Sequence, residues 1–222
     1  MQAANSALIF DFDGLILDTE NPEMQVWERL FREAGGTFDR EAYLGTIGSW
    51  DNSSYEPGVH LARLMDHGVT AQQLLERVRQ ESAECIAQEL PLPGVEKLIV
   101  RARAAGLRLA VGSSSPAAWV HGHLRRLGLF DNFDAIVTFD DVHKSKPSPE
   151  IFLTALARLG IGAEQALVLE DSHNGVLAAS RAGIRAVAVP NGVTMGQDFS
   201  LAEEVLDTLD ALVLGKYFPL AA

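Results

Sequence analysis

Short apolar runs alternate along this chain with longer segments of helical periodicity, and this alternation restricts its possible folds more than any other feature. A short apolar run is typical of a buried strand, whereas apolar residues at i, i+3, i+4 and i+7 indicate an amphipathic helix. Strands that alternate with helices form a parallel sheet covered on both faces. We therefore predict an α/β fold with a doubly wound, Rossmann-like parallel sheet. Its strands are expected at residues 7–10, 107–111, 135–137, 166–169, 186–189 and 211–214.

One long segment interrupts this alternation. Between about residues 21 and 89 the sequence has no convincing strand, but it has several amphipathic patterns, such as the one that contains Trp27 and Leu30. We therefore predict a helical domain at 21–89, inserted into a discontinuous core domain made of 1–20 and 90–222.

The composition is that of a globular protein with a strongly acidic balance. Lys and Arg total 18 against 30 Asp and Glu, which gives a formal net charge of −12. Nucleic acids and anionic membranes both require a cationic surface, so we expect neither as a partner. A small anionic ligand would need a local cation, either a metal ion or a basic side chain within its site.

Cysteine usage and the first residues indicate a reducing compartment. Cys85 is the single cysteine, so no internal disulfide can form. The start of the sequence has no basic stretch followed by a long apolar segment, and no run approaches the roughly 18 apolar residues of a membrane span. We expect a monomeric protein in the cytoplasm.

Two carboxylates, Asp11 and Asp13, directly follow the first apolar run. In open α/β sheets, ligands bind beyond the carboxyl ends of the strands, so these acids lie where chemistry is expected. Such a pair can hold a hard cation through oxygen, or one acid can attack an electrophile while the other transfers protons. An acidic pair at a strand end can also simply begin a turn.

Three further polar motifs follow later in the chain: Ser113 to Ser115 after the second predicted strand, Lys146, and Glu170 with Asp171 at the end of the fourth. Each has an ordinary interpretation, as a helix cap, a solvated lysine, or acids near a helix dipole. We expect them to form one site because all of them, with the first acidic pair, fall at the same edge of one sheet.

Together these residues suit phosphoryl transfer, which depends mainly on positioning and on neutralising charge. Asp11, Asp171 and Glu170 supply the oxygen ligands that Mg²⁺ prefers. Ser113 and nearby amides can donate to phosphoryl oxygens, and Lys146 brings a cation.

At this point the chain resembles a known family, the haloacid dehalogenase superfamily. It is most similar to the helical-cap subgroup, which contains β-phosphoglucomutases and many small-metabolite phosphatases. The four family motifs occur in order: Asp11 to Gly14, Ser113, Lys146 with Pro147, and Glu170 to Ser172 with Gly175. The resemblance implies that the first and fourth motif strands are neighbours, and that segment 21–89 is a cap over the site.

The resemblance also implies a role for each acid. Asp11 would be the nucleophile that forms an aspartyl-phosphate. Asp13 would be the general acid and then the general base, and would offer its backbone carbonyl to Mg²⁺. Asp171 would be a metal ligand, and Glu170 a ligand or a partner of one. True dehalogenases lack the second acid of the first motif, so Asp13 favours phosphate chemistry.

The remaining roles concern the phosphate group. Ser113 and Ser114 with Lys146 would hold the phosphoryl oxygens, and Lys146 would also orient Asp11. We therefore expect the partner to be a small phosphorylated metabolite, such as a sugar phosphate, hydrolysed with Mg²⁺.

Two departures from the subgroup bear on the substrate. Mutases of the subgroup usually have a histidine where this chain has Glu23, and an arginine for a second phosphate within the stretch that is Gly45 to Trp50 here. Arg77 or Arg79 could take the place of that arginine and bind a second phosphate, but we expect both side chains on a solvated helix face. Hydrolysis is therefore the preferred hypothesis, and Trp50 is a candidate for the pocket wall.

Three alternatives stay open at this point. A hexose-phosphate mutase would use the same four motifs. A receiver-like signalling module uses similar residues around Mg²⁺, but such modules are about half this length and lack the helical insert. A catalytically silent binding protein would not need the complete set of acids and lysine, and measurable turnover would exclude it.

Overall fold

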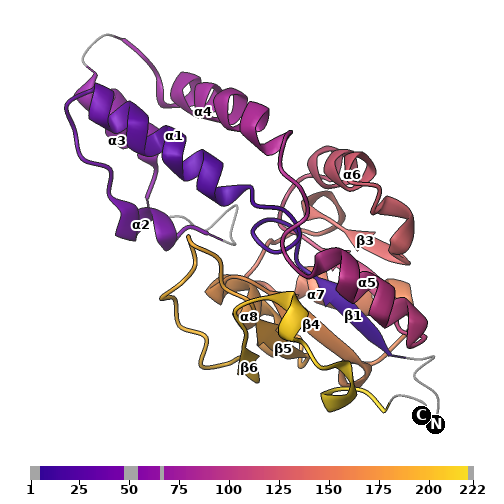
Figure 1. Ribbon diagram of the computed structural model, residues 1–222. Coiled ribbons are helices and arrows are strands. Elements are labelled where there is room, and N and C mark those ends of the chain that lie inside the picture. Colours follow the sequence, from indigo (N-terminus) through magenta and orange to yellow (C-terminus); the bar gives the residue numbers. More distant parts are fainter. Residues whose placement is uncertain (1–5, 48–54, 66–67, 220–222) are drawn as a thin grey trace.

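A six-stranded parallel sheet forms the centre of the computed structural model, which describes residues 6–47, 55–65 and 68–219 (Figure 1). The strand order is β3-β2-β1-β4-β5-β6, and every neighbouring pair is parallel. The strands are β1 (Ala7–Phe10), β2 (Arg108–Gly112), β3 (Ala135–Val137), β4 (Ala166–Glu170), β5 (Arg185–Ala188) and β6 (Glu204–Val205). This confirms the predicted α/β class.

The last predicted strand, at 211–214, is wrong. That run instead contains parts of two short 3₁₀ helices, η5 (Leu209–Ala211) and η6 (Leu214–Lys216), and the sixth strand is the two-residue β6. Leu212 and Leu214 are buried whereas Val213 between them is 64% exposed, so the run has the alternation of a strand. Its leucines pack into the core from a loop that makes no sheet pairing.

Helices cover both faces of the sheet, as a parallel sheet requires. Side chains alternate along each strand, so Leu8 and Phe10 face one side of β1 and Ala7 and Ile9 the other. The first face packs against α5 (Val95–Ala104) and α6 (Ala117–Arg126). The second face packs against α7 (Glu150–Leu159) and α8 (His173–Arg181).

Between β1 and α5 the described residues form four helices: α1 (Glu20–Glu33), α2 (Arg40–Leu44), α3 (Pro57–Leu64) and α4 (Ala71–Ile86). Among the residues described in this segment none is in a strand, as expected for the helical insert. The insert has its own hydrophobic cluster around the fully buried Trp27, and Val193 from beyond β5 joins that cluster. No helix in the described part of the chain has the length and apolar character needed to cross a membrane.

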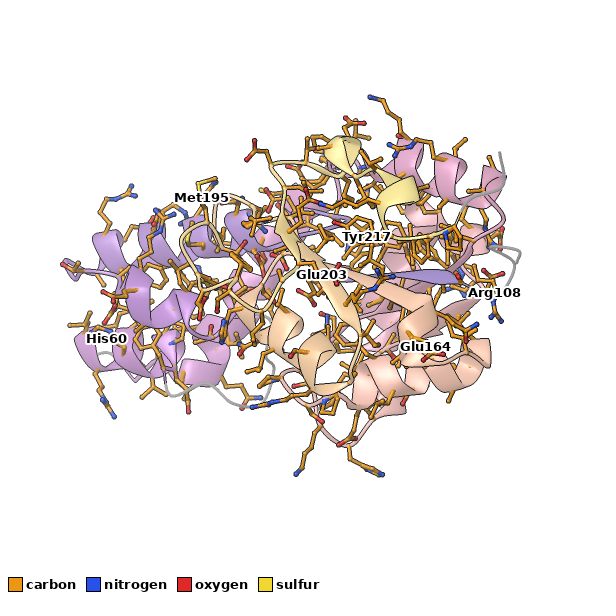
Figure 2. The ribbon with its side chains drawn as sticks, turned by 90° about the horizontal axis from the view of Figure 1, so that it is seen from below. His60, Arg108, Glu164, Met195, Glu203 and Tyr217 are labelled. Atoms are coloured by element: carbon orange, nitrogen blue, oxygen red, sulfur yellow. The ribbon has the colours of Figure 1, made fainter. Side chains whose placement is uncertain are left out.

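The insert and the far end of the sheet lie at opposite ends of the molecule. Figure 2 shows His60 of α3 at one end, and Arg108 at the start of β2 with Glu164 at the other. The carboxyl ends of the strands therefore face the inserted helices. The limits of the two predicted domains, 1–20 with 90–222 and 21–89, stay a prediction.

The register of the sheet brings the first and fourth motifs together. Phe10 of β1 pairs with Val111 of β2 on one side and with Leu169 of β4 on the other. The Asp11 amide donates to the Leu169 carbonyl at 2.9 Å, which continues the ladder beyond the strand. This confirms that the two motif strands are neighbours. The chain leaves β1 between them, at the switch point where such sheets bind ligands.

Helix α8 begins so close to the end of β4 that only glycine fits at Gly175. A Cβ there would lie 1.8 Å from Glu170 Cδ and 1.9 Å from its Oε1. We expect Gly175→Ala to lower the free energy of unfolding by about 1–3 kcal/mol, because Glu170 is buried and cannot give way.

Chemical denaturation of the variant measures this change. The matched control is Gly122→Ala, since Gly122 is on an exposed face of α6 and a Cβ there would meet nothing within 4 Å. That substitution should stabilise the protein by about 0.5–1 kcal/mol. A Gly175→Ala protein as stable as the control would contradict the close packing.

Candidate active site

A buried lysine joins the first and fourth motifs. Lys146 is 1% exposed, and its Nζ donates to Asp11 Oδ1 and, at 2.6 Å, to Glu170 Oε1. Burial lowers the pKa of Lys146, but the charges of Asp11 and Glu170 outweigh burial and hold that pKa above its ordinary value. The lysine is therefore a permanent cation at the junction of β1 and β4.

The acids around this lysine exceed its charge. Burial raises the pKa of Asp11 to about 8, although Lys146 opposes the rise. Burial, together with the charges of Glu20 and Glu170, raises the pKa of Asp171 well above its usual range. A second cation at this position would stabilise the ionised carboxylates, because an opposite charge within a few ångströms favours the charged form.

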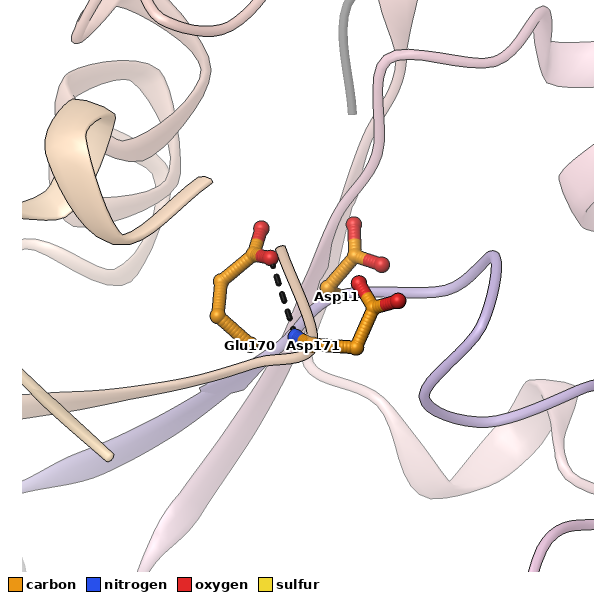
Figure 3. Close-up of side chains that lie close together, drawn as sticks. All are labelled: Asp11, Glu170 and Asp171. Carbon is orange, nitrogen blue, oxygen red and sulfur yellow. Dashed lines mark hydrogen bonds between the residues drawn. The ribbon is translucent and has the colours of Figure 1, made fainter. Parts of the chain in front are cut away.

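Three carboxylates are arranged so that they could hold such a cation. Asp11, Glu170 and Asp171 each offer one oxygen, and the three oxygens lie within 4.8 Å of one another (Figure 3). A set of carboxylate oxygens suits a hard divalent ion such as Mg²⁺. The donor set therefore fits a metal site, as the sequence predicted for these residues.

The hydrogen bonds of Glu170 distinguish it from the other two acids. Its Oε2 accepts from the amides of Asp171 and Ser172, both at 3.1 Å, and from Ser172 Oγ at 3.0 Å, while Oε1 accepts from Lys146. Glu170 thus fixes the loop after β4 and the lysine together. Asp11 and Asp171 are the better candidates for direct ligands.

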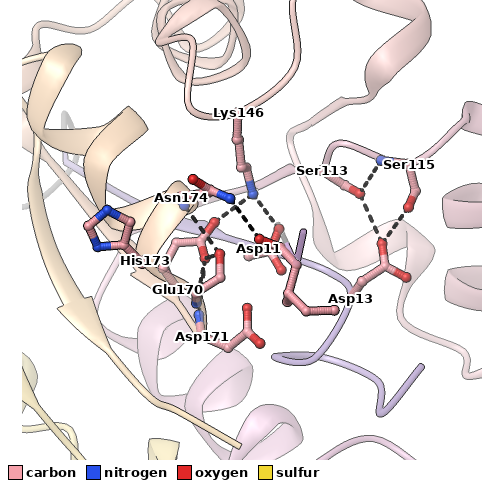
Figure 4. Close-up of polar contacts among 12 residues, drawn as sticks. Asp11, Asp13, Ser113, Ser115, Lys146, Glu170, Asp171, His173 and Asn174 are labelled. Atoms are coloured by element: carbon pink, nitrogen blue, oxygen red, sulfur yellow. Dashed lines mark hydrogen bonds and ion pairs between the residues drawn. The ribbon is translucent and has the colours of Figure 1, made fainter. Parts of the chain in front are cut away.

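Asp13 lies apart from this cluster, on the side of the site formed by the loop after β2 (Figure 4). Its Oδ1 accepts from Thr19 Oγ1 and Trp119 Nε1, both at 2.9 Å. Its Oδ2 accepts from Ser115 Oγ at 2.6 Å and Ser113 Oγ at 3.3 Å. The two acids of the first motif therefore have different surroundings: Asp11 accepts from a lysine, whereas the hydrogen bonds described for Asp13 come from neutral groups.

Sequence reasoning assigned no role to two of these four partners, Thr19 and Trp119. It included Ser115 in the serine motif after the second strand but gave it no contact, and Trp119 is part of the ordinary amphipathic pattern of α6. The signal that could have found Trp119 is its position, since it lies in the first turn of the helix that follows the Ser113 loop. Of the two serines assigned to phosphate, Ser114 lines the cavity and Ser113 is fully buried below it.

A cavity of about 470 Å³ lies between the sheet edge and the inserted helices. The sheet side contributes Asp11, Asp13 and Lys146, and its opposite wall comes from α1, α4 and the segment around α2. The residues of that opposite wall are Glu20, Glu23, Tyr43, Thr46, Ile47, Arg79, Ser82 and Ile86.

The wall on the insert side contains both acidic side chains and a cationic one, Arg79. Glu23 accepts from Trp27 Nε1 at 3.4 Å and Tyr43 Oη at 3.3 Å, and burial raises its pKa. Arg79 is exposed, as expected, and it also lines the cavity, whereas Arg77 on the same helix pairs with Glu81 at 2.7 Å. Gly48, Ser49 and the candidate Trp50 lie outside the described residues.

Comparison with known proteins identifies the family. The family described as haloacid dehalogenase-like hydrolase matches residues 8–189. YhcW of Bacillus subtilis is 38% identical over 211 residues, which are 94% of this chain and 95% of that protein. Fructose-1-phosphate phosphatase YqaB of Escherichia coli is 34% identical over 186 residues, 83% of this chain and 96% of that protein.

A solved structure agrees with this assignment. CbbY from Rhodobacter sphaeroides in complex with xylulose-1,5-bisphosphate is 28% identical, covers 93% of this chain and 96% of its own, and has a TM-score of 0.72. The resemblance inferred from the four motifs is thereby confirmed, and the receiver-like alternative is set aside. The chain belongs to the haloacid dehalogenase-like hydrolase family.

Proposed function

We propose that this protein is a Mg²⁺-dependent phosphatase that hydrolyses a small phosphorylated metabolite, such as a sugar phosphate, through an aspartyl-phosphate on Asp11. The observation that carries this proposal is the Asp11 carboxylate, paired with the buried Lys146, on the sheet side of a cavity that Asp13 also lines. The name of the relative YqaB, a fructose-1-phosphate phosphatase, supports the substrate class.

The first step forms the bond between Asp11 and phosphorus. Lys146 binds Asp11 through Oδ1, so Oδ2 would be the attacking oxygen. As that bond forms, the bond from phosphorus to the ester oxygen breaks, and the leaving alcohol takes a proton from Asp13. In the second step a water oxygen bonds to phosphorus while Asp13 takes a proton from that water. The bond between phosphorus and Asp11 breaks, so inorganic phosphate leaves and the Asp11 carboxylate is restored.

The surroundings of Asp13 suit this double role. A residue that gains and loses a proton needs neighbours that accommodate both forms. The hydroxyls of Thr19, Ser113 and Ser115 can each turn to donate or accept, whereas a lysine or arginine could only donate. The Trp119 indole N–H keeps the carboxyl in place throughout, because it remains a donor to Oδ1.

Mg²⁺ would be held by Asp11 and Asp171, with the Asp13 backbone carbonyl, and Glu170 would serve mainly as the anchor of Lys146. Bound there, the ion supplies positive charge against the phosphoryl oxygens and the nucleophile. Lys146 and Ser114 would hold phosphoryl oxygens from the sheet side, and Ser113 would orient the loop below them. The cavity wall formed by the inserted helices would bind the leaving group.

A hexose-phosphate mutase is the second candidate, and one observation keeps it in view. A mutase must hold a second phosphate, for which an arginine is well suited. Among the described residues of the cavity wall, Arg79 is the cation on the insert side, but Glu23 lies on the same wall and lowers its value as a phosphate site. Hydrolysis therefore remains the preferred function.

Substitution of the two acids separates their roles. We expect Asp11→Asn to lose almost all activity, because the nucleophile is gone. Asp13→Asn should lose roughly 10²–10⁴-fold with an alkyl phosphate, and less with an activated aryl phosphate whose leaving group needs no proton. Initial rates of phosphate release measure both effects. Asp39→Asn is the control, since Asp39 is not among the residues that line the cavity, and asparagine caps α2 as well as aspartate does. Near-normal turnover by Asp11→Asn would exclude the covalent route.

Removal of metal should stop hydrolysis reversibly. EDTA should abolish turnover and added Mg²⁺ should restore it, while Ca²⁺ should restore little because its looser and larger coordination disturbs the geometry. Asp171→Asn should raise the Mg²⁺ concentration needed for half-maximal activity, because one ionised ligand is lost. The rate at a series of free Mg²⁺ concentrations measures this. Full turnover in metal-free buffer would contradict the metal site.

The product distinguishes the two candidate functions. We expect phosphate release from sugar monophosphates and little conversion of β-glucose 1-phosphate to glucose 6-phosphate, even with a bisphosphate primer. Arg79→Gln should raise KM for sugar phosphates more than it lowers kcat, because Arg79 lies on the wall and not at the reacting atoms. Arg77→Gln on the same helix is the matched control. Mutase turnover in a coupled dehydrogenase assay that outpaced phosphate release would favour the second candidate.

A further inference from the structure

Asn191, in the loop after β5, directs its amide group at the acids of the site. Its Nδ2 donates to Asp171 Oδ2 at 2.9 Å, to the Gly14 carbonyl at 3.1 Å and to Glu20 Oε2 at 3.2 Å. These acceptors belong to three separate segments: the end of β4, the loop after β1, and the first turn of α1. One side chain thus connects the metal-site carboxylate to the beginning of the helical insert.

The orientation of this amide is determined by its other end. Asn191 Oδ1 accepts from the backbone N–H groups of Val193 at 2.7 Å and Thr194 at 3.1 Å. The backbone N–H of Asn191 in turn donates to Thr194 Oγ1 at 3.0 Å. Such side-chain bonds to amides two and three residues on are typical of asparagine turns. If Oδ1 and Nδ2 were exchanged, the NH₂ group would face the backbone N–H groups of Val193 and Thr194, which are themselves donors. The amide oxygen would then face the carboxylates of Asp171 and Glu20. Nδ2 therefore faces the acids.

The local packing leaves Asp171 little freedom. Gly14 has φ +81°, and a Cβ there would lie 2.3 Å from Asp171 Oδ2 and 2.6 Å from Asn191 Nδ2. Oδ2 of Asp171 is thus enclosed between the Gly14 backbone and the Asn191 amide. The carboxyl groups of Asp171 and Glu20 lie close enough to repel each other when both are ionised, and the Asn191 amide donates to both. Because the amide is neutral, it adds no charge that would compete with a cation.

We propose that Asn191 is a positioning residue: it holds Oδ2 of Asp171 and so leaves the other carboxylate oxygen in place for the divalent cation. The inference rests on the metal site of the proposed function. Groups that hydrogen-bond a metal ligand typically influence affinity for the metal by 10–100-fold. Loss of the Nδ2 donor should therefore weaken the binding of the metal itself, before any substrate is present.

Two substitutions separate this role from that of a turn residue. Asn191→Ala removes both the Nδ2 donor that faces the acids and the Oδ1 acceptor of the turn. Asn191→Ser keeps an oxygen that can accept from the amides of the turn, but its hydroxyl is too short to reach Asp171. The matched control is Asn174→Ala, because Asn174 Nδ2 donates at 2.8 Å to the Ile47 carbonyl of the insert and contacts no acid in the described part of the site.

The experiment is calorimetric titration of the full chain with Mn²⁺ in the absence of substrate, with a thermal melt of each variant. We expect both Asn191 variants to bind Mn²⁺ about tenfold or more weakly, and Asn174→Ala to bind it as the wild type does. The serine variant keeps the test decisive if the alanine variant fails to fold.

The outcomes separate this inference from the proposed function. Wild-type affinity in Asn191→Ser, with phosphatase activity intact, would overturn the inference and leave the function standing. An equal loss of affinity in Asn174→Ala, in proportion to a lowered Tm, would show a general structural effect and overturn it as well. Failure of the wild-type protein to bind Mn²⁺ would remove the metal site itself, and with it both proposals.

Discussion

The pairing of Lys146 with Asp11 and Glu170 is the interaction on which the rest of the site depends. A fully buried lysine is costly unless its charge is compensated and its donors are occupied. The two carboxylates meet both needs, but they come from β1 and β4, so the ion pairs form only when these strands are neighbours in register. The same requirement explains the exclusion of any side chain at Gly175, because Glu170 occupies that space. The order of the strands in the sheet and the ion pairs of the site therefore depend on each other.

Charge balance explains why the site combines a lysine with a place for a metal ion. Lys146 compensates at most one of the neighbouring carboxylates, and Asp171 and Glu20 add further acids. A phosphate monoester entering this cavity would meet net negative charge. A divalent cation held by the proposed ligands Asp11 and Asp171 would reverse the local balance and would lower the pKa of Asp11, because an opposite charge favours the ionised carboxylate. The acidic sequence, with its net charge of −12, is thus compatible with an anionic substrate only through such local compensation.

The sequence predicted the sheet and the principal acids because both leave periodic or positional signals. Short apolar runs mark buried strands, and polar residues directly after them must lie at the sheet edge. Thr19 and Asn191 leave no such signal, since each is an ordinary loop residue, and Trp119 leaves only the weak signal of its place in the first turn of α6. Their contacts with Asp13 and Asp171 arise from tertiary packing between distant segments. The strand expected at 211–214 failed for a related reason: buried leucines either side of an exposed valine produce a strand pattern in a loop.

The loop after β5 physically connects the acids of the site to the helical insert. At its start Asn191 contacts Asp171. Two residues later Val193 is buried in the hydrophobic cluster of the insert, and Gln197 Nε2 donates to the Leu44 carbonyl at 3.0 Å. Any movement of the insert that withdrew Val193 from its cluster would therefore pull on the turn that orients Asn191. The position of the cavity wall and the order of the metal ligands are then linked through one short loop. A substrate that draws the insert onto the sheet edge would, by this linkage, also secure the carboxylate that holds the cation.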